Sequence, residues 1–167
     1  MNIYLDADVL FKKRLIVFLL WLEDCGGPKL FTSETAWDEA IRNRKKRYTN
    51  FSTRDQSTYN HILNYLNSNG RIIQRQDYIN SKITCGNTDA KDVHNVKAAF
   101  EIRNIDSIIT FNIKDYDISH ISTTLNMNTE ECDHFLTTYN STNNPIINCA
   151  INKLIAIYRT QKLREMM

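Results

Sequence analysis

The stretch Ile3-Tyr4-Leu5-Asp6-Ala7-Asp8-Val9-Leu10 decides the fold of this 167-residue chain. Its first three residues are β-branched, aromatic and apolar, which is typical of a buried strand, and a helical pattern follows directly. The predicted strand ends on a carboxylate, Asp6. In open parallel sheets, ligands bind beyond the carboxyl ends of the strands, so this acid is a candidate site residue.

Three further apolar segments predict strands, at Lys29–Phe31, Arg71–Gln74 and Ser107–Thr110. Helical patterns alternate with the strands, near Val9–Glu23, Ser33–Asn43, Asp55–Ser68 and Asp89–Arg103. This alternation is typical of an α/β fold with a parallel sheet. A hydrophobic content of 42% with 24% charged residues is ordinary for one globular domain with a buried core.

Three more acids lie close to predicted strand ends: Glu39, Asp92 and Asp115. Glu39 falls inside a helical pattern beside Asp38, and spacing alone does not choose between these two. Asp92 shares the core-facing stripe of its predicted helix. Asp115 and Asn112 follow the strand that ends at Thr110, so all these side chains are expected at the same edge of the sheet.

Together these segments resemble a PIN domain. The final one, Thr110-Phe111-Asn112-Ile113-Lys114-Asp115-Tyr116, resembles the family's Thr-x-Asn-x-x-Asp-aromatic signature. The resemblance covers about residues 1 to 136, because Met127–Leu136 is similar to the family's closing helix. It implies a three-layer α/β/α domain with a central, mostly parallel sheet over residues 1–140. Residues 141–167 are expected to be a C-terminal helical extension of the same domain.

The chain departs from the family pattern in two places. Many members carry Asn where this chain has Asp8, which either adds a carboxylate to the site or caps the first helix. Many members carry Asp where Asn112 stands, so either its carbonyl oxygen or the Asp115 carboxylate is the closer contact, and charge favours Asp115. Between Asp38 and Glu39, the family pattern selects Glu39.

The resemblance implies a nuclease in which four acids are catalytic and bind metal, with one amide as a further ligand: Asp6, Glu39, Asp92, Asp115 and Asn112. Oxygen ligands without His or Cys fit Mg²⁺ or Mn²⁺ better than Zn²⁺. Such a cation provides a nucleophilic water and neutralises the charge that builds on phosphorus. The expected activity is hydrolysis of single-stranded or loop RNA by an endoribonuclease.

In its size, its single domain and its four acids the chain is similar to the toxin of a VapC-type (type II) toxin–antitoxin pair, and this resemblance implies a small antitoxin and a homodimer as partners beside the RNA substrate. Two alternatives stay open. One is a PIN nuclease of RNA processing or defence without an antitoxin. The other is a catalytically silent PIN-like module that binds RNA or protein.

A basic run follows the helix that carries Glu39, and its residues are expected to bind nucleic acid: Arg42, Arg44, Lys45, Lys46, Arg47 and Tyr48. The net charge is only +2, so the chain is not a general nucleic-acid coat. A solvated helix face is the alternative interpretation of this run. Tyr48, Phe51 and Tyr116 are candidates for stacking on unpaired bases.

The sequence predicts a cytoplasmic protein with no membrane segment. Leu15–Leu22 is apolar but too short to span a bilayer. The four cysteines show no CxxC spacing, so we expect reduced thiols and neither a zinc site nor a disulfide framework. Apolar residues recur at helical spacing near the C-terminus, which predicts either packing on the body of the domain or an interface: Ile147, Ala150, Ile151, Leu154 and Tyr158.

Overall fold

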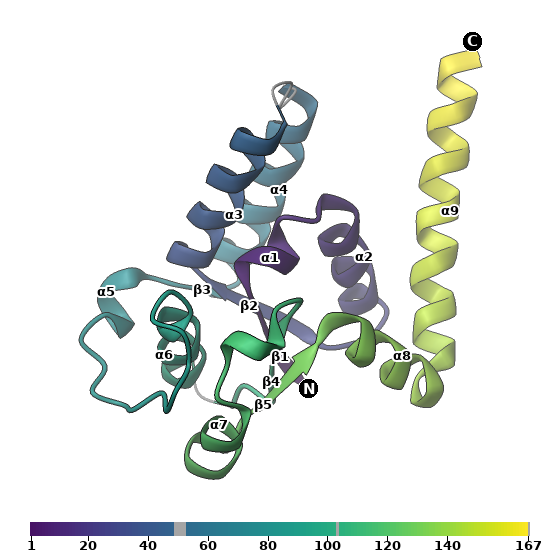
Figure 1. The fold of residues 1–167 in the computed structure, drawn as a ribbon. Helices are drawn as coiled ribbons and strands as arrows, with labels where there is room; N and C mark the ends of the chain where they lie inside the picture. The colour runs from purple at the N-terminus through teal and green to yellow at the C-terminus, as the bar shows by residue number, and fades with distance from the viewer. Residues whose placement is uncertain (49–52, 103, 167) are drawn as a thin grey trace.

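Five parallel strands form one sheet in the order β3-β2-β1-β4-β5 (Figure 1). The strands are β1 (Asn2–Leu5), β2 (Lys29–Ser33), β3 (Ile72–Ile73), β4 (Ser107–Thr110) and β5 (Asn128–Glu131). This computed structural model describes residues 1–48, 53–102 and 104–166, with side chains up to residue 157 except Arg54. The predicted α/β class with a parallel central sheet is confirmed.

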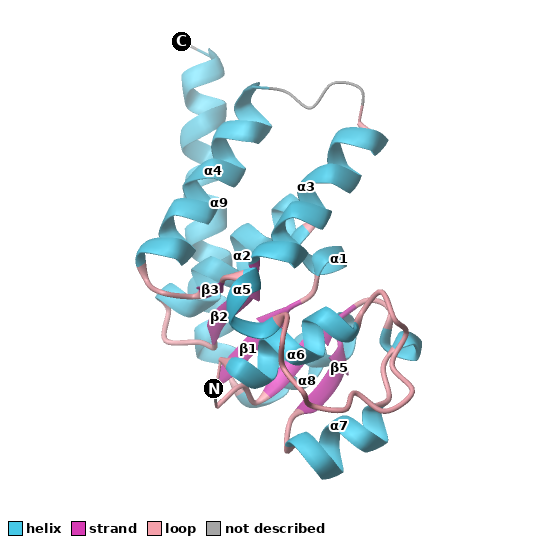
Figure 2. Cartoon of the chain, turned by 90° about the vertical axis from the view of Figure 1, so that its left-hand side faces the viewer, coloured by secondary structure: helices cyan, strands magenta, loops and turns pink. Residues whose placement is uncertain are grey.

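Helices cover both faces of the sheet, so the three-layer arrangement is confirmed as well (Figure 2). Along β1, Ile3 and Leu5 point to one face and Tyr4 to the other. The first face packs against α1 (Ala7–Leu10), α2 (Lys13–Asp24), α3 (Glu34–Arg47), α4 (Thr53–Ser68) and α8 (Cys132–Thr142). The second face packs against α5 (Arg75–Tyr78), α6 (Val93–Glu101) and α7 (Ile118–Leu125). Within the described residues, no helix is both long enough and apolar enough to cross a bilayer.

The central strand β1 determines where a site can form. Tyr4 lies opposite Phe31 of β2 and opposite Ile108 of β4. After β1 the chain adds β2 and β3 on one side and then crosses to the other side to add β4 and β5. The strand order therefore reverses between β1 and β4, and at such a switch point the loops beyond the strands leave a crevice. Asp6 follows β1 there, and Asn112 lies just beyond β4.

The helix predicted over Val9–Glu23 is instead two helices, α1 and α2, with a break at Phe11. The carbonyl groups at the break bind side chains from other helices. The Tyr59 hydroxyl lies 3.1 Å from the Leu10 carbonyl oxygen and 3.0 Å from that of Phe11. Arg44 Nη1 donates to the Phe11 carbonyl at 2.8 Å. These donors stand where helical N–H groups would be, so the break depends on residues distant in sequence.

The closing helix predicted over Met127–Leu136 is wrong in its first half. Asn128–Glu131 form β5, which pairs with β4 from Ser107 to Thr110, and α8 begins only at Cys132. Pairing with a buried neighbouring strand outweighs the polar composition of this segment. The helix predicted from Asp89 also begins later, at Val93, which leaves Asp92 at the N-cap of α6.

The expectation of reduced thiols is wrong for one pair, because Cys25 and Cys149 form a disulfide. Cys25 ends α2, and Cys149 lies in the long helix α9 (Asn144–Met166), 124 residues later. Ile147 and Ala150 of α9 pack around Leu22 of α2. The first turns of α9 therefore lie against the body of the protein, while its far end extends beyond it (Figure 1).

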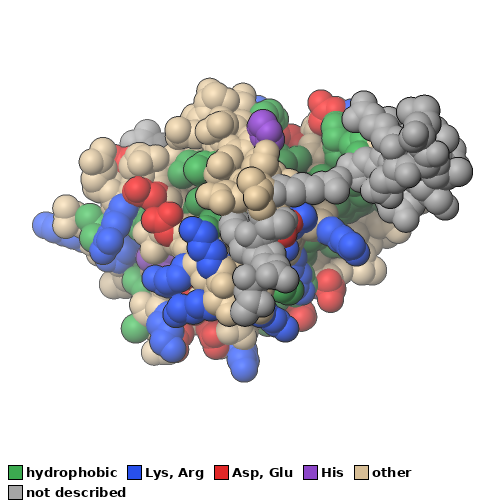
Figure 3. All heavy atoms as spheres, turned by 90° about the horizontal axis from the view of Figure 1, so that it is seen from above, with side chains coloured by type: hydrophobic (Ala, Val, Ile, Leu, Met, Phe, Trp, Pro, Cys, Tyr) green, Lys and Arg blue, Asp and Glu red, His purple; other side chains and the backbone are tan. Residues whose placement is uncertain are grey.

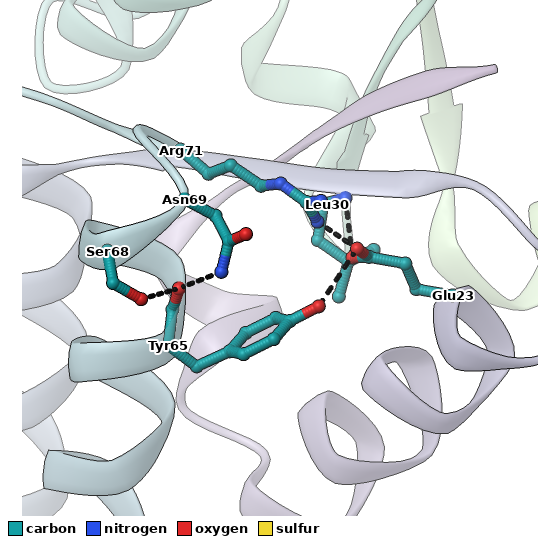
Figure 4. Close-up of polar contacts among 6 residues, drawn as sticks. All are labelled: Glu23, Leu30, Tyr65, Ser68, Asn69 and Arg71. Carbon is teal, nitrogen blue, oxygen red and sulfur yellow. Dashed lines mark hydrogen bonds and ion pairs between the residues drawn. The ribbon is translucent and has the colours of Figure 1, made fainter.

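Glu23, at the end of α2, connects three elements (Figure 4). Its Oε1 accepts hydrogen bonds from Arg71 Nη1 and from the Tyr65 hydroxyl, the latter at 3.2 Å. Its Oε2 accepts from the Leu30 amide at 3.2 Å. The Glu23 and Arg71 side chains are only 8% and 14% exposed, so this ion pair is shielded from water. It fixes α2 against β2 and against the end of α4.

Candidate active site

Asp6 is held from four directions at the end of β1. It is 5% exposed and caps α1. Its Oδ1 accepts hydrogen bonds from the Ala7 amide at 2.5 Å and from Asn95 Nδ2 at 2.8 Å. Its Oδ2 accepts from the hydroxyls of Thr110 and Tyr116, both at 2.8 Å. A carboxylate offers about four lone-pair positions, so donors of the protein occupy them all.

The donors to Asp6 belong to a buried polar network that joins both halves of the sheet. Asn95 of α6 is fully buried, and its Nδ2 also donates to the Tyr116 hydroxyl at 3.0 Å. The Tyr4 hydroxyl is bonded to Asn95 Oδ1 at 2.9 Å and to Ser33 Oγ at 2.8 Å. Burial, followed by the charge of Asp6, raises the pKa of Tyr116, so its hydroxyl stays protonated and able to donate.

Asp8 lies beside Asp6 and does not cap α1. Its Oδ2 accepts from the Phe111 amide at 2.9 Å and lies 3.2 Å from Thr110 Oγ1, whose single proton it shares with the nearer Asp6 oxygen. Its Oδ1 is buried and has no hydrogen-bond partner among the described residues. Burial and then the neighbouring charge of Asp6 raise the pKa of Asp8 to about 6. Of the two roles left open by the sequence, the structure therefore favours an additional carboxylate at the site.

Asp92 is the point where the predicted acids converge. It is half-buried at the N-cap of α6, and its side chain makes no capping hydrogen bond. Its pKa is raised to about 7, first by burial and then by the negative charges of Asp6, Asp115, Asp89 and Glu39. Since charge interactions weaken with distance, these carboxylates from separate elements share one environment. The charges of the other three predicted acids, Asp6, Asp115 and Glu39, therefore act on Asp92.

The structure also bears on two ambiguities in the sequence. Glu39 is half-buried and its charge acts on Asp92, whereas Asp38 is exposed. Asn112 is exposed, and its Nδ2 donates to the carboxylate of Asp115, which ends the short helix η1 (Ile113–Asp115). Both observations favour the acids that the family pattern and charge selected.

The types of donor atom at the site suit a hard divalent cation, but the distances between the acidic side chains do not. Its donors are carboxylate and amide oxygens, which suit Mg²⁺ or Mn²⁺. Within residues 1–48, 53–102 and 104–166, however, no three His, Cys, Asp or Glu side chains are grouped so that they could hold a metal ion. A cation that binds Asp6 therefore has to displace one of its four donors, for example the hydroxyl of Thr110 or Tyr116.

The basic run lies on the last turns of α3. Lys and Arg side chains gather near the end of this helix (Figure 3), and the exposed basic members of the run are Arg42, Lys45, Lys46 and Arg47. Arg44 is half-buried and turns toward α1. Of the stacking candidates, Tyr48 is 45% exposed, but the prediction for Tyr116 is wrong, because that ring is buried and its hydroxyl binds Asp6. Phe51 lies outside the described residues.

Sequence reasoning missed the residues that hold Asp6, above all Asn95. The available signal was an amide among the apolar residues of α6, three positions after Asp92. His94, two residues after Asp92, is a partly packed histidine whose Nδ1 lies 2.6 Å from the Lys91 carbonyl oxygen. Its Nε2 is buried and has no hydrogen-bond partner in the part of the chain that the structure describes.

No model of a known protein family, no curated protein and no solved structure matches this chain. The resemblance to PIN domains therefore stays a prediction, and the function has to be argued from the site itself.

Proposed function

We propose that the protein is a metal-dependent endoribonuclease that hydrolyses single-stranded or loop RNA beyond the carboxyl ends of β1 and β4. The observation that carries the proposal is the placement of acids beyond these strands: Asp6 is buried at the end of β1, the Asp8 carboxylate binds the Phe111 amide after β4, and Asp92 stands at the N-cap of α6. Burial and then the charges of neighbouring acids raise the pKa of Asp92 to about 7, in agreement with this placement. Crowded acids are costly unless a cation or proton compensates their charge. Such clusters are concentrated at functional sites, and this one lies at the switch point of the sheet.

The residues that would hold Mg²⁺ or Mn²⁺ are Asp6, Glu39, Asp92 and Asp115, with Asn112 as a further oxygen ligand. When bound, the cation supplies an activated water and neutralises charge on the phosphate. Asn95 and Tyr116 orient the Asp6 carboxylate through hydrogen bonds of 2.8 Å each. The exposed lysine and arginine side chains at the end of α3 attract the RNA backbone toward the acids.

The test is cleavage of end-labelled single-stranded RNA with Mg²⁺, with Mn²⁺ or with a chelator. We expect cleavage with a metal only, and a loss of several orders of magnitude in Asp92→Asn and Glu39→Gln. Asp38→Asn is the matched control, since it removes the adjacent but exposed acid of the same helix, and should stay within about threefold of wild type. Cleavage by Asp92→Asn at the wild-type rate, from equally pure protein, would refute the assignment.

A second candidate function is a catalytically silent module that binds RNA. The observation in its favour is that all four lone-pair positions of Asp6 already accept hydrogen bonds from the protein. Metal titration separates the two candidates. A melting temperature that rises with millimolar Mn²⁺, but not in Asp92→Asn, supports the nuclease, and an unchanged melting temperature supports the silent module.

A role as the toxin of a toxin–antitoxin pair is part of the same proposal and rests on the sequence resemblance alone. Its test is expression in a bacterial host. Growth arrest by the wild type but not by Asp92→Asn supports the role, and normal growth at equal protein levels contradicts it.

A further inference from the structure

A pocket of about 390 Å³ lies where the α1–α2 junction faces α3. Its lining includes three basic residues and two aromatic residues that carry the argument: Lys12, Arg14, Arg44, Phe11 and Tyr48. Only two of these, Arg44 and Tyr48, belong to the basic run of α3. Phe11 and Lys12 form the break between α1 and α2, and Arg14 lies in the first turn of α2.

The pocket carries an excess of positive charge. Of the further lining residues, Lys13 forms an ion pair with Asp55, so these two charges compensate each other. Among the lining residues that the structure describes, no further acid balances the ammonium of Lys12 and the guanidinium groups of Arg14 and Arg44. Like charges held this close repel one another, and an anion between them relieves the repulsion.

Arg44 is already held in position for such an anion. Its guanidinium carbon lies 4.9 Å from the ring centre of Tyr48, 5.8 Å from that of Phe11 and 5.5 Å from that of Tyr59. Its Nη1 donates to the Phe11 carbonyl, and its Nε is buried with no hydrogen-bond partner among the described residues. A fixed planar guanidinium suits the geometry of a phosphate group.

The aromatic side chains add a surface for a base. The rings of Phe11 and Tyr48 lie 6.0 Å apart at an angle of 24°, and Tyr48 is 45% exposed. Unpaired bases stack on exposed aromatic rings beside a basic groove, whatever their sequence. A phosphate next to a stacked base is the repeating unit of a single-stranded nucleic acid.

The pocket is next to the acid cluster. Asp6 and Phe11 stand at the two ends of α1, which rises only about 6 Å over its four residues. Lys12 Nζ lies 3.3 Å from the centre of the Phe111 ring, and the Phe111 amide donates to Asp8. The pocket therefore adjoins the carboxylates, separated from them by the length of α1.

We propose that this pocket binds the backbone phosphate of a single-stranded RNA, with one base stacked on Tyr48, and so guides the strand toward the acids. The proposal rests on the proposed function for the identity of the ligand. It makes Lys12 and Arg14 substrate-binding residues, and it makes Arg44 part of a built site rather than of a solvated helix face.

The test is the binding of a fluorescein-labelled octamer of uridylate to the full chain in the presence of a chelator, so that no cleavage is required. Lys12→Ala with Arg14→Ala should weaken binding about tenfold or more at low salt, and should reduce the salt dependence of log Kd by about 0.7, the value for one lost phosphate contact. Tyr48→Ala should weaken binding about tenfold with an unchanged salt dependence.

The matched control is Lys29→Ala with Lys82→Ala, which removes two exposed positive charges that do not line the pocket. Equal Kd values for the control and for the Lys12 and Arg14 variant, both with wild-type melting temperatures, would overturn the pocket. So would displacement of the RNA by an oligoglutamate of equal charge at equal concentration, because the ligand would then be an acidic protein segment. Pocket-dependent binding without cleavage in Mn²⁺ supports the pocket and refutes the nuclease. Cleavage in Mn²⁺ together with RNA binding that the Lys12 and Arg14 variant leaves unchanged supports the nuclease and refutes the pocket.

Discussion

Asp6→Asn and Asp8→Asn should change stability in opposite directions, although both remove one negative charge from the same cluster. If charge crowding alone mattered, both variants of the metal-free protein would be more stable than wild type. The hydrogen bonds distinguish them: Asp6 accepts four, whereas one Asp8 oxygen is buried without a partner among the described residues.

For Asp6→Asn, the amide can keep only one of the two oxygens. If that oxygen faces Ala7 and Asn95, the new NH₂ group faces the hydroxyls of Thr110 and Tyr116. In the wild type both hydroxyls donate to Asp6, so the NH₂ group meets donors instead of acceptors. Hydrogen bonds to a charged group contribute about 1.5–3 kcal/mol each, and partial reorientation of the hydroxyls recovers some of this. We expect a loss of about 3 kcal/mol in the free energy of unfolding.

For Asp8→Asn, burial raises the pKa from its usual 3.8 to about 6. At about 1.4 kcal/mol for each tenfold change in proton affinity, the ionised form costs up to about 3 kcal/mol, which partial exposure reduces to about 1–2 kcal/mol. The folded protein binds this proton more tightly than the unfolded chain, so wild type is stabilised below pH 3.8 and loses that contribution as the pH rises to about 6. The variant should therefore gain stability above pH 6 and gain nothing near pH 4.

The assay is urea unfolding of wild type and both variants, with a chelator, between pH 4 and pH 8. We expect the midpoint for Asp8→Asn to exceed that of wild type only at the upper end, and the midpoint for Asp6→Asn to lie below wild type throughout. A stabilised Asp6→Asn at pH 8 would show that repulsion outweighs the hydrogen bonds, and would refute this reasoning.

Three further predictions concern the scaffold. Glu23→Ala leaves its arginine partner buried and unpaired, so urea unfolding should show a loss of about 3–5 kcal/mol, whereas full stability would mean that the pair is solvated. Gly86 has a φ of +59°, and a Cβ there would lie 2.4 Å from Asp117 Oδ2, so Gly86→Ala should lower the thermal midpoint by an amount equivalent to about 1–3 kcal/mol. An unchanged midpoint would show that this loop adjusts freely. Cys25→Ser should cost about 3–5 kcal/mol under oxidising conditions because the disulfide to Cys149 spans 124 residues, and should make the protein insensitive to reductant. A wild type whose unfolding is unaffected by reductant would contradict the last prediction.

The sequence predicted the buried parts of the sheet well and its polar edge poorly. β1 and β4 are apolar runs whose two faces are both covered, so their composition indicates strands directly. β5 carries Asn128, Glu130 and Glu131, and only its pairing with β4 makes it a strand. Charged residues are common on edge strands, where they hinder pairing with another molecule, and they also obscure the strand in the sequence.

Some residues of the site could likewise be predicted from the sequence, and others could not. Its acids could be predicted because each lies beside a recognisable element. The contacts of Asp6 with Asn95 and Tyr116 could not, because they join residues 89 and 110 positions apart. The same holds for the disulfide, since cysteine connectivity cannot be deduced from spacing alone.

The disulfide closes a covalent ring of the chain that does not contain β1, the central strand of the sheet. Residues 25–149 contain β2, β3, β4 and β5, whereas β1 lies in the arm of 24 residues that precedes the ring. Because β1 pairs with β2 on one side and with β4 on the other, the ring by itself forms two half-sheets with a vacant slot between them. The arm fills that slot, and it brings Asp6, Asp8 and Phe11 with it. A single proteolytic cut between β1 and Cys25 would leave the ring covalently intact, and only noncovalent contacts would then hold the strand that carries Asp6.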